Sequence, residues 1–171
     1  LTDRATGDEW LFRTFAFNPN AARAVYSVGR PVHLQRKDGH VFDFAYGPMG
    51  ELVSITDGFG RSAAVTWRHY RRTALANIAG SLPVPEAIAA IALPDGTSLH
   101  YSYDPPEAAP STGVARRLVK VERLSPANVV VETTRYHYED ADFPSRLTGI
   151  TDNRGIRFST YAYDRLGRAT S

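Results

Sequence analysis

The sequence predicts an all-β protein, an antiparallel meander of β-hairpin repeats that forms a curved sheet. Three observations support this prediction. The chain repeats itself. Nine Tyr and eight Phe favour the pleated, half-buried surface of a sheet over a helix. Thirteen Gly and 11 Pro divide the chain into short pieces. Arrays of equivalent supersecondary units are more often scaffolds or containers than compact enzymes.

The repeat is visible at two levels. The segment Tyr46–Ser54 aligns without a gap on Tyr163–Ser171. The pattern Asp-Gly-x-x-apolar-x-aromatic-x-Tyr begins at Asp38 and recurs at Asp95. Because the last residues restart a unit seen earlier, we expect the chain to be a piece of a longer array.

The strands are predicted from short apolar or alternating runs between turn residues. The first run is Trp10–Phe17, which ends at Asn18-Pro19-Asn20. Five hairpins follow, and their paired strands are 32–36 and 41–46, 51–56 and 63–68, 89–93 and 98–103, 118–124 and 129–138, and 146–151 and 157–163. A Gly such as Gly39 supplies the positive φ that closes a bulged hairpin.

Alternation along the strands predicts two different faces. Phe42, Phe44 and Tyr46 share one side of a strand, because side chains alternate with period two. The other side carries Asp43 and Ala45. The same reading places Leu99, Tyr101 and Tyr103 opposite His100 and Ser102. One aromatic face suits a sheet that is buried on one side, and the hydrophobic fraction of 43% is enough for a packed interior.

Two segments interrupt the regular alternation of predicted strands and turns. Residues 73–88 are Ala-rich with two prolines, and could hold a strand, a loop or a short helix. Residues 104–115 are polar and Pro-rich, which is typical of an insertion between units. We therefore predict lead-in strands over 1–31 and a repeat region over 32–171 with insertions near 73–88 and 104–115. No boundary is strong enough to divide the chain into two domains.

The repeated residues resemble the Rhs/YD-repeat proteins. The units of that family carry a Tyr-Asp dipeptide, a Gly four residues after the Tyr, and a Leu-x-x-Ile-x-Asp element. Here the Tyr-Asp pairs begin at Tyr103 and Tyr163, and the second element begins at Leu52 and Leu147. Departures occur as well, since Tyr46 is followed by Gly47 and Tyr138 by Glu139, and Leu118–Glu122 matches the second element loosely. The resemblance covers roughly residues 32 to 171.

The resemblance implies an antiparallel sheet that spirals into a hollow shell. In that family the shell encloses a C-terminal effector domain, often a toxin, delivered out of a bacterial cell by type VI secretion or by a toxin complex. Expected partners are further shell segments and the enclosed effector, with self-association possible through open strand edges. The family's self-cleavage motif has no convincing match, because Asp104-Pro105 is a lone dipeptide inside an insertion.

Composition argues against several other classes of function. The 20 basic and 18 acidic residues leave a net charge of +2, and the densest basic clusters, 68–72 and 116–117, are small. A nucleic-acid binder carries a more concentrated basic surface. The chain has no Cys, so disulfides and thiolate sites are excluded. No apolar run is long enough for a membrane span.

The residues that could carry chemistry favour structural roles. The five His residues, at 33, 40, 69, 100 and 137, show no metal-ligand spacing. His100 and His137 are expected to pack beside repeat tyrosines, and His40 to face solvent. The acids Asp38, Asp57, Asp95 and Asp152 each stand at a predicted hairpin, where Asp bonds its own backbone. We therefore predict no catalytic residue, no cofactor and no metal site, and a structural role without enzymatic activity.

Carbohydrate binding is the alternative function. Sugar-binding modules present aromatic platforms that stack on pyranose rings, and Trp10 and Trp67 are available for this role. Aromatic residues in register at repeat positions more often belong to the core, so this hypothesis stays second.

Overall fold

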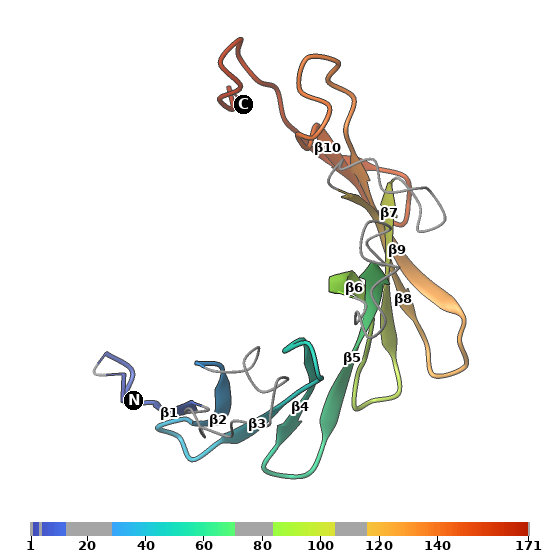
Figure 1. Cartoon of the computed structure of the whole chain (residues 1–171). Helices are drawn as coiled ribbons and strands as arrows, with labels where there is room; N and C mark the ends of the chain where they lie inside the picture. The colour runs from blue at the N-terminus through green and yellow to red at the C-terminus, as the bar shows by residue number, and fades with distance from the viewer. Residues whose placement is uncertain (1, 4, 13–28, 71–83, 105–115, 171) are drawn as a thin grey trace, which may run out of the picture. The chain divides into compact units, whose positions relative to one another are not determined.

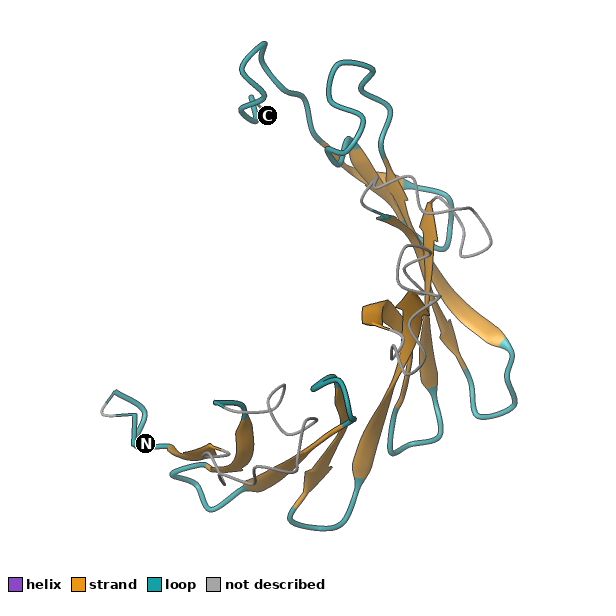
Figure 2. Cartoon of the chain, in the orientation of Figure 1, coloured by secondary structure: helices purple, strands orange, loops and turns teal. Residues whose placement is uncertain are grey.

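The computed structural model describes residues 2–3, 5–12, 29–70, 84–104 and 116–170. Eleven strands follow one another in chain order in an antiparallel sheet (Figures 1 and 2). The described residues contain no helix. The predicted all-β meander is confirmed.

Contacts divide the chain into two units, Leu1–Pro94 and Asp95–Ser171, which are described separately. The first unit contains β1 (Glu9–Phe12), β2 (Pro31–Gln35), β3 (Val41–Tyr46), β4 (Leu52–Asp57), β5 (Ser62–Tyr70) and β6 (Val84–Ala92). The second unit contains β7 (Ser98–Asp104), β8 (Arg117–Leu124), β9 (Val130–His137), β10 (Gly149–Thr151) and β11 (Arg157–Thr160).

Several strand bounds differ from the predicted ones. Strand β6 begins at Val84, inside the stretch 73–88, because it continues to pair with β5 as far as Tyr70. Pro85 is accommodated beside a register shift in that pair, where a missing N–H donor is tolerated. Strand β10 begins only at Gly149, since the preceding loop folds into its own turns. Residues 13–17 of the first predicted strand, 73–83 and 105–115 lie outside the described residues.

Six of the described turns share one hydrogen-bonding pattern. The N–H of the first turn residue donates to the carbonyl of the fifth, and the N–H of the fourth donates to the carbonyl of the first. The first residues are Arg36, Gly47, Asp57, Ser125, Asp152 and Asp164. The fourth residue has a positive φ in every case, and it is a glycine except for Asn128 with φ of 57°. Asn tolerates this conformation better than other side chains, so it replaces glycine in the repeat.

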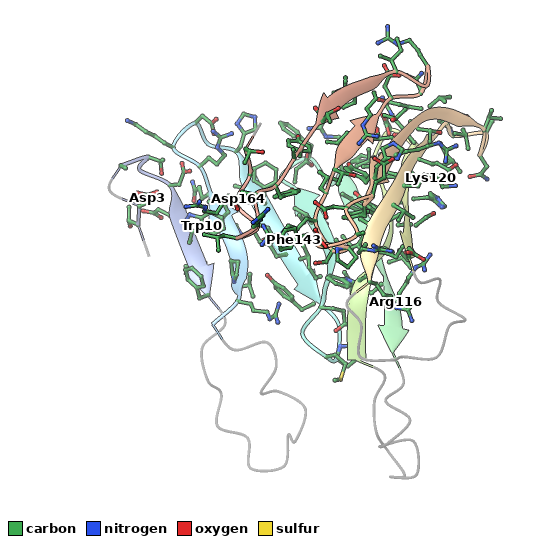
Figure 3. The ribbon with its side chains drawn as sticks, turned by 90° about the horizontal axis from the view of Figure 1, so that it is seen from above. Asp3, Trp10, Arg116, Lys120, Phe143 and Asp164 are labelled. Atoms are coloured by element: carbon green, nitrogen blue, oxygen red, sulfur yellow. The ribbon has the colours of Figure 1, made fainter. Side chains whose placement is uncertain are left out.

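The first unit has one aromatic face and one face of small and polar residues. Trp10 pairs with Leu34, which pairs with Phe42, so these residues line one face. The Trp10 and Phe44 rings stack with centroids 6.2 Å apart. Asp43 is exposed on the opposite face, which confirms the predicted alternation of β3. Figure 3 shows the side chains that the strands project, with Trp10 labelled.

The packed interior expected from composition is not found. No hydrophobic side chain in the described ranges is buried, and the large aromatics of β3 are half-buried. The buried polar residues are Glu51 and Thr148. The reason is that the described strands pack against their neighbours in the same sheet, and a single layer covers neither of its faces completely.

Candidate functional site

The acids at the hairpins are turn caps. The Asp57 carboxylate accepts hydrogen bonds from the amides of Phe59 and Arg61 and from the Arg61 side chain. Asp152 accepts the equivalent bonds from Arg154 and Ile156. The turn role predicted for these acids is confirmed, because their oxygens are occupied by the chain's own donors.

These hydrogen bonds also determine how the carboxylates titrate. The Arg154 side chain, followed by the Ile156 amide, holds the pKa of Asp152 below its usual value. The amide of Arg168 and then its side chain do the same to the pKa of Asp164. A lowered pKa means that the folded chain stabilises the ionised carboxylate. A general acid needs the opposite shift, so these groups are poorly suited to that role.

An aromatic side chain closes the open end of several hairpins. In each case an O–H or N–H in the second strand of the hairpin, or just beyond that strand, donates to a backbone carbonyl at or just before the start of the first strand. The pairs are Tyr46 with Pro31 at 2.8 Å, Trp67 with Leu52 at 2.7 Å, Tyr138 with Leu118 at 2.9 Å and Tyr163 with Leu147 at 2.8 Å. We call this arrangement the aromatic clasp.

In three clasps an arginine stacks on the tyrosine ring. The guanidinium carbons of Arg30, Arg117 and Arg146 lie 5.6, 5.2 and 5.1 Å from the ring centroids of their tyrosines. Each arginine directly precedes the residue whose carbonyl accepts the clasp bond. Sequence reasoning missed these arginines, although an Arg-Leu or Arg-Pro dipeptide upstream of a repeat tyrosine would have revealed them.

A polar cluster joins β9, β10 and β11. The Nε2 atom of His137 lies 2.7 Å from Oγ1 of Thr151, and Arg157 donates to Glu139 at 2.9 Å and to the Thr148 carbonyl at 2.7 Å. The order Thr–His–Glu resembles a catalytic triad. However, the distance from His137 Nδ1 to the Glu139 carboxylate is 3.8 Å, and Arg157 already binds that carboxylate. The cluster is better explained as a cross-strand brace.

The remaining described histidines have local partners. His33 contacts Asp43 at 2.7 Å across β2 and β3, and His100 contacts Ser98 at 3.1 Å. His40 contacts Asp38 and its side chain is 55% exposed, as predicted. The side chain of His69 lies outside the described residues. Within the described ranges, no group of three or more His, Cys, Asp or Glu side chains could hold a metal ion.

The two tryptophans are engaged within the sheet. Trp10 stacks on Phe44, and Trp67 donates its indole N–H to the Leu52 carbonyl. Both side chains are half-buried. They are therefore poor platforms for a sugar, and any carbohydrate site must use other aromatic residues.

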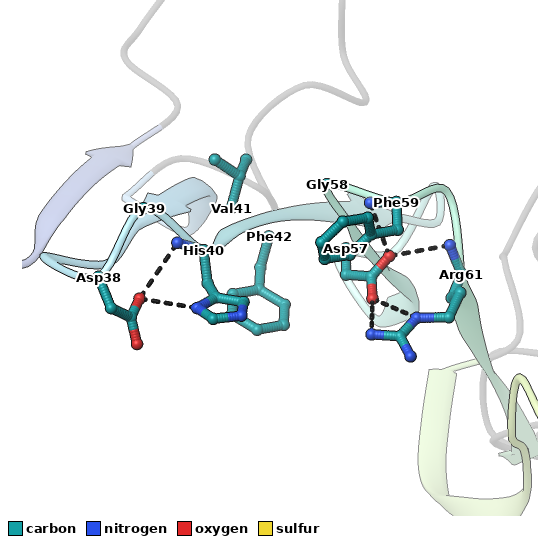
Figure 4. A pocket seen from close by; sticks show the side chains of 9 residues that line it. All are labelled: Asp38, Gly39, His40, Val41, Phe42, Asp57, Gly58, Phe59 and Arg61. Atoms are coloured by element: carbon teal, nitrogen blue, oxygen red, sulfur yellow. Dashed lines mark hydrogen bonds and ion pairs between the residues drawn. The ribbon is translucent and has the colours of Figure 1, made fainter.

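A groove of about 450 Å³ lies between two hairpin turns of the first unit, 36–40 and 57–61 (Figure 4). The amide of Gly58 donates to the Val41 carbonyl at 3.0 Å, which fixes one turn against the neighbouring strand. Figure 4 shows His40, Phe42 and Phe59 between Asp38 on one side and Arg61 on the other. The groove combines aromatic rings with charged groups, as small-molecule sites do.

The basic clusters do not form an extended basic surface where the structure describes them. Arg117 binds the carboxylate of Asp104 and the carbonyl of Pro144, and it stacks on Tyr138. The side chains of residues 69–72 lie outside the described residues. The described part of the chain also offers no helix that could cross a membrane.

Comparison with known proteins gives a likeness in fold. The sequence matches no protein-family model and no curated protein. Among solved structures, the crystal structure of TcdB2-TccC3 without its hypervariable C-terminal region aligns with 96% of this chain at 16% identity and a TM-score of 0.51. The chain covers 8% of that protein.

Two further alignments involve the same kind of assembly. The crystal structure of TcdB2-TccC3 gives a TM-score of 0.49 at 18% identity over 82% of this chain and 6% of that one. The Tc holotoxin pore of Photorhabdus luminescens gives 0.46 at 17% identity over the same shares. The alignment with a TM-score of 0.51 shows that the chain shares a fold with a small part of a much larger protein.

Proposed function

We propose that this chain is a wall segment of an Rhs/YD-repeat shell of the toxin-complex type, which encloses and shields a secreted effector domain. The observation that supports this most directly is the fold likeness over 96% of the chain to TcdB2-TccC3. The repeated turns and aromatic clasps agree with it, because they form a series of equivalent hairpins.

The strand edges and faces support the same proposal. Strands β1 and β11 each have one neighbour in the sheet order, so each presents backbone groups to a further strand. The described residues of each unit provide no second layer that would bury the apolar side chains of the sheet. A segment built this way gains stability from further shell strands, and a second copy of the chain is the other partner that these edges could accept.

The proposed role needs no chemistry from the chain itself. The turn carboxylates cap backbone amides, and the described histidines have side-chain partners within the sheet. We propose that any enzymatic activity belongs to the enclosed effector, and that the assembly is secreted or delivered from a bacterial cell.

Native mass spectrometry of the protein purified from its source cell tests this proposal. We expect it in a complex with a larger Tyr-Asp-repeat chain and an effector. The effector should resist added protease while the complex is intact, and become sensitive after mild denaturation opens the shell. A lone species of 18.9 kDa, or a simple homo-oligomer, would contradict encapsulation.

A further inference from the structure

The groove between turns 36–40 and 57–61 contains a residue that the repeated turn does not require. Phe59 is the third residue of its turn and is 77% exposed. The third residues of the five equivalent turns are Asp38, Met49, Ala127, Arg154 and Leu166. Since this position accepts polar, small and large apolar residues, the turn conformation does not require an aromatic ring at Phe59.

The surroundings of Phe59 are polar and held in place. The Arg61 side chain binds Asp57 at 2.7 and 2.6 Å through Nε and Nη2, and its guanidinium carbon lies 5.5 Å from the Phe59 ring centroid. This leaves Nη1 of Arg61 without a hydrogen-bond partner among the described residues. The guanidinium is thus a positioned donor that lies over one face of the Phe59 ring.

The opposite wall of the groove supplies acceptors. The Oδ1 atom of Asp38 accepts from the His40 amide at 3.1 Å and lies 2.9 Å from His40 Nδ1. Within the described residues, the Oδ2 atom has one distant contact, with Nη1 of Arg36 at 3.7 Å. When Nδ1 of His40 donates to Asp38, its Nε2 becomes an acceptor. The Phe42 ring lines the space between these groups and Phe59 (Figure 4).

We propose that this groove is a binding site for a neutral saccharide, with Phe59 as the stacking platform. A pyranose ring has an apolar face of C–H groups and a rim of hydroxyls that both donate and accept. Phe59 and Phe42 match the apolar face, whereas Asp38, His40 and Arg61 match the rim. The lining carries two carboxylates and one guanidinium, so an acidic sugar would be repelled.

The site is independent of the proposed shell function, and its test is a separate one. Amide chemical shifts of the isotope-labelled full chain are followed during titration with maltohexaose, cellohexaose, chitohexaose and mannohexaose. Concentrations up to about 10 mM cover the weak affinities expected of a shallow, single-platform site. We expect saturable shifts for at least one sugar, centred on His40 and Phe59.

The variant Phe59→Ala should weaken binding about tenfold or more, because it removes the platform. Leu166→Ala is the matched control. Leu166 is the third residue of turn 164–168, is 74% exposed, and lies between an Asp–Arg pair like that of Asp57 and Arg61. This control should bind like the parent. Asp38→Asn should also weaken binding while the Phe59 platform remains.

Three results would overturn the proposal. The first is the absence of saturable shifts with all four sugars. The second is equal binding by the parent and Phe59→Ala. The third is that hexalysine, used as a cationic probe, shifts the same amides while the sugars do not, which would identify the groove as a site for basic peptides.

Discussion

Replacing Tyr138 by Phe tests whether the aromatic clasp stabilises the hairpins. The substitution removes one hydroxyl, which donates to the Leu118 carbonyl at 2.9 Å, and leaves the ring in place. Arg117 can still stack on that ring at 5.2 Å. Burial raises the pKa of Tyr138, which agrees with a hydroxyl held away from bulk water.

The expected loss follows from the hydrogen bond alone. A hydrogen bond of this kind contributes about 0.5–1.5 kcal/mol to the free energy of unfolding. With a denaturant slope of about 1–3 kcal/mol per molar urea, a loss of about 1 kcal/mol lowers the unfolding midpoint by about 0.3–1 M. Tyr138→Leu should cost about 0.5–1 kcal/mol more, because it also removes the cation–π contact with Arg117.

Urea unfolding followed by circular dichroism measures these losses. Tyr161→Phe is the control, since the Tyr161 hydroxyl has no hydrogen-bond partner in the described part of the chain. Its midpoint should match that of the parent. If Tyr138→Phe unfolds at the same urea concentration as Tyr161→Phe, the clasp bond contributes nothing and the reasoning is refuted.

Three further predictions concern the turns and the polar brace. Gly39→Val should cost over about 1 kcal/mol because Gly39 has φ of 86°. Gly58→Ala should be nearly neutral, and equal melting temperatures for the two variants would contradict the turn assignment. Gly149→Ala should displace Arg157, because the added Cβ would overlap the Arg157 guanidinium, and so weaken the brace. Faster hydrogen exchange of the Arg157 side-chain N–H groups, measured by NMR, would show this displacement. An unchanged exchange rate would argue against it. The pKa of Asp152 is lower in the folded chain than in the unfolded chain, where it is about 3.9, so the ionised carboxylate stabilises the fold above that pH. This stabilisation is lost as the pH falls through the pKa that Asp152 has in the folded chain. Urea midpoints should therefore fall less steeply below about pH 4 in Asp152→Asn than in the parent; parallel curves would count against this.

The turn residues explain why much of the fold could be predicted from the sequence. A Gly in an Asp-x-x-Gly or x-Asp-Gly turn requires positive φ, and Gly39, Gly60, Gly96 and Gly155 all have it. The alternation of Phe42, Asp43 and Phe44 likewise follows from the period of a strand. These are local properties, so they can be read from a few neighbouring residues.

Contacts between residues far apart in the sequence were harder to predict. The clasp joins Tyr138 to Leu118, two residues that the pairing of β8 with β9 brings together across 20 positions of the sequence. The lack of a buried hydrophobic side chain among the described residues was also missed, because composition gives the amount of apolar surface and not the number of layers that cover it. The groove at Phe59 depends on the spacing of two turns, which no single motif contains.

The repeats allow structural and functional residues to be separated within one chain. A residue that recurs at equivalent positions, such as the glycine at the fourth turn position, is explained by the backbone conformation that every turn needs. A residue whose type varies among equivalent exposed positions has no such explanation. Phe59 is a residue of this kind, because the same turn position elsewhere holds Asp38 or Leu166, and it lies beside a groove whose polar groups are already held by other contacts. The scaffold and the groove can therefore be tested with different substitutions, because Tyr138 belongs to a clasp and Phe59 lines the groove.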